Sequence, residues 1–251
     1  MKKHDFSQVI PILIPNNAKF AIVLLNTSDN MCFSATASFG ASTVLLTIGT
    51  LSIIKSENIP QRFLATIPLI FSVQQFAEGL VWISLTNRNY YYLHDVFMYV
   101  FLVFAEVVWP IFFPLSIVLL EKDPKRRKVL LGCLVIGTLT GVYLFFCLIF
   151  YKADAFIVNY HIRYDQNFPM ADIKWGGLMY FIATILSTYV SSVKSMKIFG
   201  SVMLLSYIVT RVFYGYYFIS VWCFFGAILS FLLLFIIIRI NKTADSLSLI
   251  E

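Results

Sequence analysis

Hydrophobic residues along this chain form seven long runs separated by short polar segments. A bilayer core about 30 Å thick requires roughly 20 apolar residues of helix, and each run reaches or approaches that length. The pattern therefore predicts an all-α fold, a polytopic membrane protein built as a seven-transmembrane-helix bundle. The predicted spans cover approximately residues 34–54, 62–86, 96–120, 128–151, 175–193, 197–214 and 216–239.

The composition supports a membrane protein and argues against a water-soluble one. Hydrophobic residues make up 59% of the chain and charged residues 13%, and the mean hydropathy is +0.82. A soluble globular protein has close to a quarter of its residues charged. This chain has too little polar surface to cover a body in water, so the lipid bilayer is its expected partner.

The basic residues predict an orientation. Five of the nineteen fall between Glu121 and Lys128, in a short segment that separates two apolar runs. Loops rich in Lys and Arg stay on the cytoplasmic side of a membrane. Counted over alternate loops, the excess places the N-terminus outside and the C-terminus in the cytoplasm. This loop also accounts for the net charge of +6 without a nucleic-acid partner.

Three regions follow from this reading: an N-terminal extension at 1–30, a seven-helix membrane domain at 31–242 and a cytoplasmic tail at 243–251. The extension mixes basic, apolar and polar stretches and has no signal-peptidase cleavage pattern. An interfacial segment or an extended gene start fits it better than a signal peptide. Met31 lies directly before the first apolar run, so either Met1 or Met31 is the start.

Motifs for nucleotide binding, metal binding and known catalytic mechanisms are absent from the sequence. The cysteines Cys32, Cys133, Cys147 and Cys223 form no CxxC pair, so a disulfide framework or a zinc site is not indicated. Buried thiols that act as small hydrophobic groups are the simpler interpretation. With only three histidines in the chain, no metal site and no cofactor are expected.

The second run carries a polar stripe in the segment FSVQQFAEGLVW, Phe71 to Trp82. On a helix, Gln75, Glu78 and Trp82 share one face, and Gln74 lies one turn before Glu78. An ionisable residue at bilayer depth costs about 2.5–3.5 kcal/mol on insertion scales and usually faces the bundle interior.

Two further ionisable residues lie inside predicted spans. Glu106 is one turn from Trp109 in a segment that also holds Pro110 and Pro114, two residues expected to bend the helix. Arg211 is near the outer end of the sixth run. The predicted orientation puts Glu78, Glu106 and Arg211 in the outer half of the bundle.

The only long connection, 152–174, lies on the same predicted side. His161, Arg163 and Asp165 alternate within it, so an extended backbone would place all three on one face. A surface loop with an Arg–Asp pair is one interpretation. A lid over an outer cavity, with His161 as acid, base or ligand, is the other.

Two interpretations of the intramembrane charges remain. In the first, Glu78 or Glu106 pairs with Arg211 and holds the helices together. In the other, an outward-facing polar pocket binds a small ligand, a cation or a proton for transport or sensing, with Arg211 as counter-charge. An intramembrane, hydrolase-like enzyme that uses a carboxylate or Cys32 with His161 is the alternative function. The candidate ligand-binding residues are Gln74, Gln75, Glu78, Trp82, Glu106, Trp109, His161, Arg163, Asp165 and Arg211.

Five segments resemble an uncharacterised bacterial family of multi-pass membrane proteins whose members begin at or near Met-Cys-Phe-Ser-Ala. The resemblance covers roughly residues 31–240 and implies a multi-pass fold in the bacterial inner (plasma) membrane, but no reaction. It also favours Met31 as a start, which would leave Cys32 at the amino terminus after methionine removal. The segments are MCFSATASFG, FSVQQFAEGLVW, VVWPIFFPLSIVLLE, HIRYD and SVWCFFGAILS.

Overall fold

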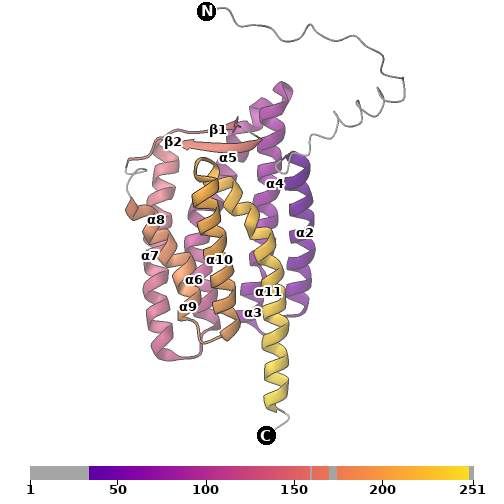
Figure 1. Cartoon of the computed structure of the whole chain (residues 1–251), viewed down its shortest axis with the longest axis vertical. Coiled ribbons are helices and arrows are strands. Elements are labelled where there is room, and N and C mark those ends of the chain that lie inside the picture. The colour runs from indigo at the N-terminus through magenta and orange to yellow at the C-terminus, as the bar shows by residue number, and fades with distance from the viewer. Residues whose placement is uncertain (1–33, 159, 170–173, 249–251) are drawn as a thin grey trace, which may run out of the picture. The chain divides into compact units, whose positions relative to one another are not determined.

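The structure, a computed structural model, describes residues 34–158, 160–169 and 174–248 (Figure 1). These residues form a bundle of helices with one β-hairpin at one end. The expectations for the extension at 1–30, for the start of translation and for Cys32 lie outside the described residues.

Six helical segments of the described chain are long and apolar enough to cross a membrane. Each coincides with one of the predicted runs, so the hydrophobic pattern located them correctly. They are α2 (Ala35–Ile54); α3 (Ile59–Ala65) with α4 (Ile67–Thr86); η1 (Arg88–Leu93), α5 (His94–Leu102), η2 (Val103–Val108) and α6 (Trp109–Leu120); α7 (Pro124–Phe150); α10 (Lys194–Phe213); and η4 (Gly215–Tyr217) with α11 (Phe218–Ser248).

The run predicted at 175–193 forms a shorter helix. It comprises α8 (Lys174–Phe181), η3 (Ile182–Leu186) and α9 (Ser187–Val190), and its apolar part is Gly177–Val190. That part is below the roughly 20 residues that a full crossing needs. Ala183, Thr184 and Ile185 are buried, so the segment packs inside the bundle while the count of seven spans stays a prediction.

The described chain is predominantly helical, as the predicted all-α class requires, and its connection 152–174 contains one β-hairpin. Strand β1 (Ala153–Val158) pairs antiparallel with β2 (His161–Gln166), and Tyr160 turns the chain at φ 64°. Ala153, Ala155, Ile162 and Tyr164 are buried on one face of the hairpin. Successive side chains of a strand point to opposite faces, and this alternation lets the hairpin cover the end of the bundle with an apolar face. We call this the hairpin end.

The third span is irregular around Glu106. Residues Val103–Val108 form a π-helical segment in which the N–H of Trp109 donates to the carbonyl of Phe104, five residues back. The same pattern would pair the Ala105 carbonyl with residue 110, which is a proline and has no N–H. The Tyr180 hydroxyl donates to the Ala105 carbonyl instead, at 2.7 Å. A side chain of α8 therefore satisfies the backbone group that Pro110 leaves open.

Helix α7 packs closely on this irregular segment through two glycines four residues apart. A Cβ at Gly137 would lie 1.8 Å from the carbonyl oxygen of Pro110, and one at Gly141 would lie 3.0 Å from that of Val107. Small residues at this spacing let membrane helices approach closely. Pro110 and α7 therefore lie in backbone contact.

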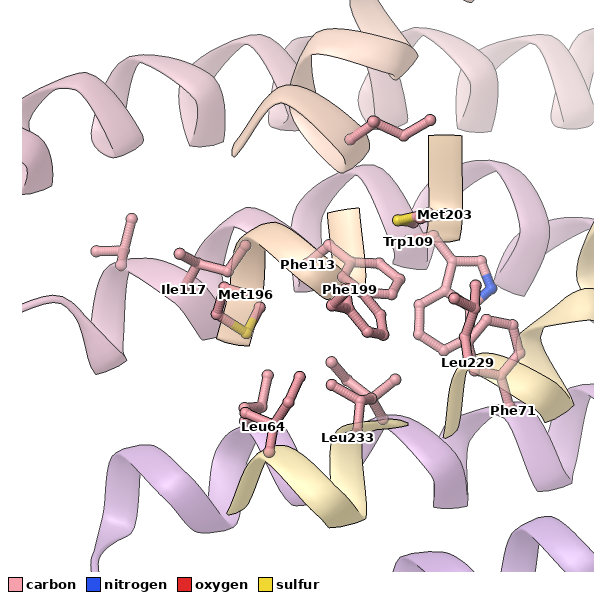
Figure 2. Close-up of a cluster of buried hydrophobic side chains, with 14 of the residues drawn as sticks. Leu64, Phe71, Trp109, Phe113, Ile117, Met196, Phe199, Met203, Leu229 and Leu233 are labelled. Carbon is pink, nitrogen blue, oxygen red and sulfur yellow. The ribbon is translucent and has the colours of Figure 1, made fainter. Parts of the chain in front are cut away.

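The apolar core of the middle of the bundle is built around stacked rings (Figure 2). Phe71 of α4 stacks on Trp109 of α6 with ring centroids 3.9 Å apart, and Trp109 in turn contacts Phe113. Phe113 lies against Phe199 of α10. A second cluster, which includes Phe101 and Tyr164, lies beneath the hairpin.

The end of the bundle opposite the hairpin carries the Lys- and Arg-rich loop, and we call it the basic end. Glu121 joins two loops there: one oxygen accepts from the N–H of Asp123 and from the Ser192 hydroxyl, and the other from the N–H of Ser192 at 2.6 Å. Arg126 donates to the carbonyl of Val190 at 2.9 Å. These contacts fasten the α6–α7 loop to the segment before α10.

Acid is expected to weaken this junction. Burial alone would raise the pKa of Glu121, but the hydrogen bonds from Ser192 and Asp123 outweigh it and lower that pKa. The group therefore stabilises the fold above its unfolded pKa of roughly 4.3, and the contribution is lost as the pH falls through the lower folded value. Thermal unfolding of wild type and Glu121→Gln should differ most near neutral pH and converge in acid. Glu57→Gln, an exposed acid at the same end, should track the wild type, and a wild-type to Glu121→Gln difference that is constant with pH would contradict this account.

Candidate functional site

Buried polar side chains gather at the hairpin end of the bundle, where α4, η2, β2, α8 and α11 meet. The cluster holds two carboxyl groups, and most of its members are almost completely buried. We refer to these residues as the polar cluster: Gln74, Gln75, Glu78, Glu106, Tyr164, Gln166, Tyr180, Ser220 and Cys223.

Glu78 is held by hydrogen bonds to both of its oxygens. The Gln75 amide donates to Oε2 at 3.2 Å, one turn along the same helix, and the Ser220 hydroxyl of α11 donates to Oε1 at 2.5 Å. The helical spacing of Gln75 and Glu78 predicted the first contact. Ser220 belongs to a span far along the chain, and its role was not predicted.

Gln74 connects its own span to two others. Its helical spacing had suggested a contact with Glu78 instead. Its carbonyl oxygen accepts from the indole N–H of Trp109 at 2.7 Å, and its amide donates to the Cys223 sulfur at 3.0 Å. Trp109, which the sequence suggested as a candidate ligand-binding residue, is buried. Cys223 therefore belongs to the polar cluster through its contact with Gln74.

Glu106 projects from the π-helical segment toward the hairpin. The Gln166 amide of β2 donates to its Oε1. Tyr180, which caps the freed carbonyl of Ala105, also lies within electrostatic range of Glu106. The hydrogen bond from Gln166 holds the Glu106 carboxyl group at the hairpin, and the bond from Tyr180 to the Ala105 carbonyl ties the adjacent backbone to α8.

Three buried polar atoms in this cluster have no hydrogen-bond partner: Gln75 Oε1, Glu106 Oε2 and the Tyr164 hydroxyl. Buried polar atoms are paired in the great majority of cases, and exceptions call for an explanation such as a bound water or ion. The Tyr164 hydroxyl also lies within electrostatic range of Glu78. Unpartnered polar atoms therefore lie close to both Glu78 and Glu106.

The polar cluster is surrounded by tightly packed side chains. A cavity of about 20 Å³ adjoins it, lined by Trp109, Tyr180, Thr184, Trp222 and Cys223 together with apolar residues. That volume suits about one water molecule. The cavity beside the polar cluster is therefore small, and the open polar pocket expected from the sequence stays a prediction.

Arg211 does not join the polar cluster. It is exposed near the end of α10, and neither ion pair found in the described residues includes it. The expected role as counter-charge is therefore not supported, because a long basic side chain near a helix end extends toward the aqueous boundary. Among the side chains that the structure describes, which leave out those of Lys174 and Lys242, no Lys or Arg is buried.

The hairpin places the predicted loop residues on its other face. Arg163 and Asp165 pair at 3.2 Å with both side chains largely exposed. His161 packs against the rings of Tyr217, with centroids 4.8 Å apart, and Tyr214. The three residues share one face of β2, as the alternation predicted, and the surface Arg–Asp pair was one of the two interpretations considered. The inward face of β2 is the opposite one, which carries Tyr164 and Gln166. The apolar residues Ile162 and Tyr164 on that face were the signal that could have identified it.

Trp82 is buried among apolar side chains beneath the hairpin. Helical spacing predicted that Trp82 shares a face with Gln75 and Glu78, and Trp82 forms the apolar end of that face. Among the described residues, no group of three His, Cys, Asp or Glu side chains is arranged to hold a metal ion.

Comparison with known proteins places the chain in a family. Residues 31–247 match the model of a family of unknown function, DUF6629, so the chain belongs to this family. No curated protein and no solved structure matches the chain.

Proposed function

We propose that this member of the DUF6629 family binds a proton or a small cation at Glu78 and Glu106, as a multi-pass membrane protein that serves transport or sensing. One observation carries the proposal. Two buried carboxyl groups from different spans share a cluster that contains unpartnered buried oxygens, and none of the described Lys or Arg side chains is buried.

The charge balance supports an occupant that is positive. A charged carboxylate at bilayer depth is costly, and it persists where it is paired or coordinates a cation. Ser220, Gln75 and Gln166 supply neutral hydrogen bonds to the two glutamates. Neutral donors leave the net charge of the pair unchanged, so a proton or a cation is the natural complement.

The size of the free space supports a small occupant. The cavity beside Trp109, Tyr180 and Cys223 has a volume of about 20 Å³, close to that needed by one water molecule. A proton or a partly dehydrated monovalent cation fits this scale. An organic ligand would require the hairpin or the surrounding helices to move.

The hairpin supports a route for this occupant. Gln166 contacts Glu106 and Tyr164 lies in range of Glu78, so both carboxyl groups are covered by β2. In the proposed orientation the hairpin faces outward, the basic end lies in the cytoplasm and the shorter helix Gly177–Val190 completes seven spans of a bacterial inner-membrane protein. The occupant would then enter from outside past Tyr164 and Gln166.

Cation-dependent thermal unfolding of the purified chain tests the proposal. At constant ionic strength, replacing choline with sodium or potassium should raise the melting temperature of wild type, since ligands that bind only the folded state stabilise it. Glu78→Gln and Glu106→Gln should abolish the shift, while Glu57→Gln, far from the cluster, should retain it.

The same variants distinguish a proton from a metal cation. If a proton is the occupant, sodium and potassium give no shift, mild acid stabilises wild type, and Glu78→Gln and Glu106→Gln each lose part of that stabilisation. Equal cation and acid responses in wild type, Glu78→Gln and Glu106→Gln would rule out the proposed site. In that case the cluster would serve only to hold the helices together.

A further inference from the structure

A groove between α10 and α11 lies at the basic end, opposite the polar cluster. It has a volume of about 80 Å³ and is lined by Ile198 and Phe199 of α10 and by Leu232, Phe235 and Ile236 of α11. Ile198 and Phe235 are 54% and 60% exposed, so the groove opens on the surface of the bundle that would face lipid.

The two helices run antiparallel, which brings polar groups to the same end of this groove (Figure 1). Ser195 lies one turn before Phe199 in α10, and Arg239 lies one turn after Phe235 in α11; both line the groove. The apolar walls of the groove therefore end beside a basic group, Arg239, and a hydroxyl group, Ser195. That end is at the level of the helix termini, where the headgroups of a bilayer lie.

The electrostatics of this end favour an anion. Lys194 and Lys197 are exposed beside Ser195, and neither α10 nor α11 up to Asn241 contains an acidic residue. Of the described side chains, none caps the N-terminus of α10, and the partial positive charge of a helix N-terminus attracts anions. Ser195 also lines the groove and is only 7% exposed.

We propose that this groove binds one anionic phospholipid, with an acyl chain between α10 and α11 and the phosphate at Arg239 and Ser195. The apolar walls argue for a lipid in place of a free phosphate ion, and the surplus of basic groups argues for an anionic headgroup in place of a zwitterionic one. Basic sites between spans at the cytoplasmic side are a known mode of anionic lipid recognition. The site is separate from Glu78 and Glu106, so it does not depend on the proposed function.

Lipid-dependent thermal unfolding, with binding counted by native mass spectrometry, tests this site. The delipidated full chain in a neutral detergent is titrated with phosphatidylglycerol or with phosphatidylcholine of the same acyl chains. Phosphatidylglycerol should give the larger shift in melting temperature and one retained lipid. Arg239→Gln should weaken its binding about fivefold, the effect of one basic residue on an anionic lipid.

Two further variants separate the groove from general surface charge. Ile198→Trp fills the groove from an exposed position and should remove the retained lipid. Arg211→Gln removes an exposed arginine from the opposite end of α10 and should leave binding unchanged. The proposal is overturned if phosphatidylcholine or inorganic phosphate stabilises the chain as much as phosphatidylglycerol. It is also overturned if Arg239→Gln and Ile198→Trp bind like wild type, or if Arg211→Gln loses as much as Arg239→Gln.

Discussion

Gly137→Ala is expected to destabilise the bundle strongly, although alanine is the better helix former. The added Cβ would lie 1.8 Å from the Pro110 carbonyl oxygen and 2.8 Å from its carbon. These are backbone atoms, so no side-chain rotation relieves the clash and α7 must move away from the third span. Overpacking of this kind costs typically about 1–3 kcal/mol and occasionally more. Thermal unfolding in detergent should show a large fall in melting temperature.

Two other glycines of α7 provide a graded control. A Cβ at Gly132 meets nothing within 4 Å, and one at Gly141 meets the Val107 carbonyl and the Ile111 side chain at 3.0 Å. Gly132→Ala should be neutral or slightly stabilising because alanine is favoured in helices by roughly 0.5–1 kcal/mol. Gly141→Ala should fall between the two. A Gly137→Ala protein as stable as Gly132→Ala would mean that α7 does not contact Pro110 as described.

Gln166→Leu is expected to uncouple the hairpin from the bundle. The Gln166 amide is a hydrogen-bond donor to Glu106 Oε1, and Glu106 Oε2 is already without a partner. The substitution leaves a buried carboxyl group with less hydrogen bonding, which costs about 1–3 kcal/mol and more if the group is charged. A lower melting temperature and faster proteolysis within 152–169 should result.

The adjacent residue and a double variant test the cause. Asp165→Asn alters the outward face of the same strand, where an exposed ion pair is worth at most about 1 kcal/mol. It should have little effect on stability. Combining Gln166→Leu with Glu106→Leu removes both partners and should recover much of the loss, because an apolar pair leaves no unsatisfied group. Additive losses in the double variant would contradict a direct Gln166–Glu106 interaction.

The spans were predictable because each buries its backbone hydrogen bonds within one segment. Hydrophobic length alone therefore located six of them, such as Ala35–Ile54 and Pro124–Phe150. The seventh run is also helical, but its apolar part is short. A run of hydrophobic residues that packs inside a bundle has the same sequence signal as one that crosses a bilayer.

The candidate site was predictable only where its residues are local in sequence. Gln75 and Glu78 are one helical turn apart, and Glu106 was identified because it is an ionisable residue inside a predicted span. Ser220 and Gln166 reach the glutamates through tertiary packing, which helical spacing does not reveal. The irregular third span was partly foreseen from Pro110, but the π-helical segment and the hydroxyl of Tyr180 that satisfies it depend on the neighbouring α8.

The arrangement links the proposed occupant to the only β-structure in the described chain. Tyr164 and Gln166 lie on the inward face of β2, above the two glutamates, while Arg163 and Asp165 face away. Protonation of Glu106, or binding of a cation to it, would change the strength of its hydrogen bond with Gln166. The hairpin is therefore positioned to respond to the state of the carboxyl groups.

The central claim is that Glu78 and Glu106 hold a proton or a cation within the membrane, and infrared spectroscopy of the reconstituted protein tests it most directly. Protonated carboxyl groups and cation-bound carboxylates absorb at different frequencies, and Glu78→Gln and Glu106→Gln assign the bands. We expect either a protonated carboxyl band that is lost in these variants, or a carboxylate band that shifts between sodium and choline. Two bands that respond to neither cation nor proton exchange, in a folded wild-type protein, would contradict it.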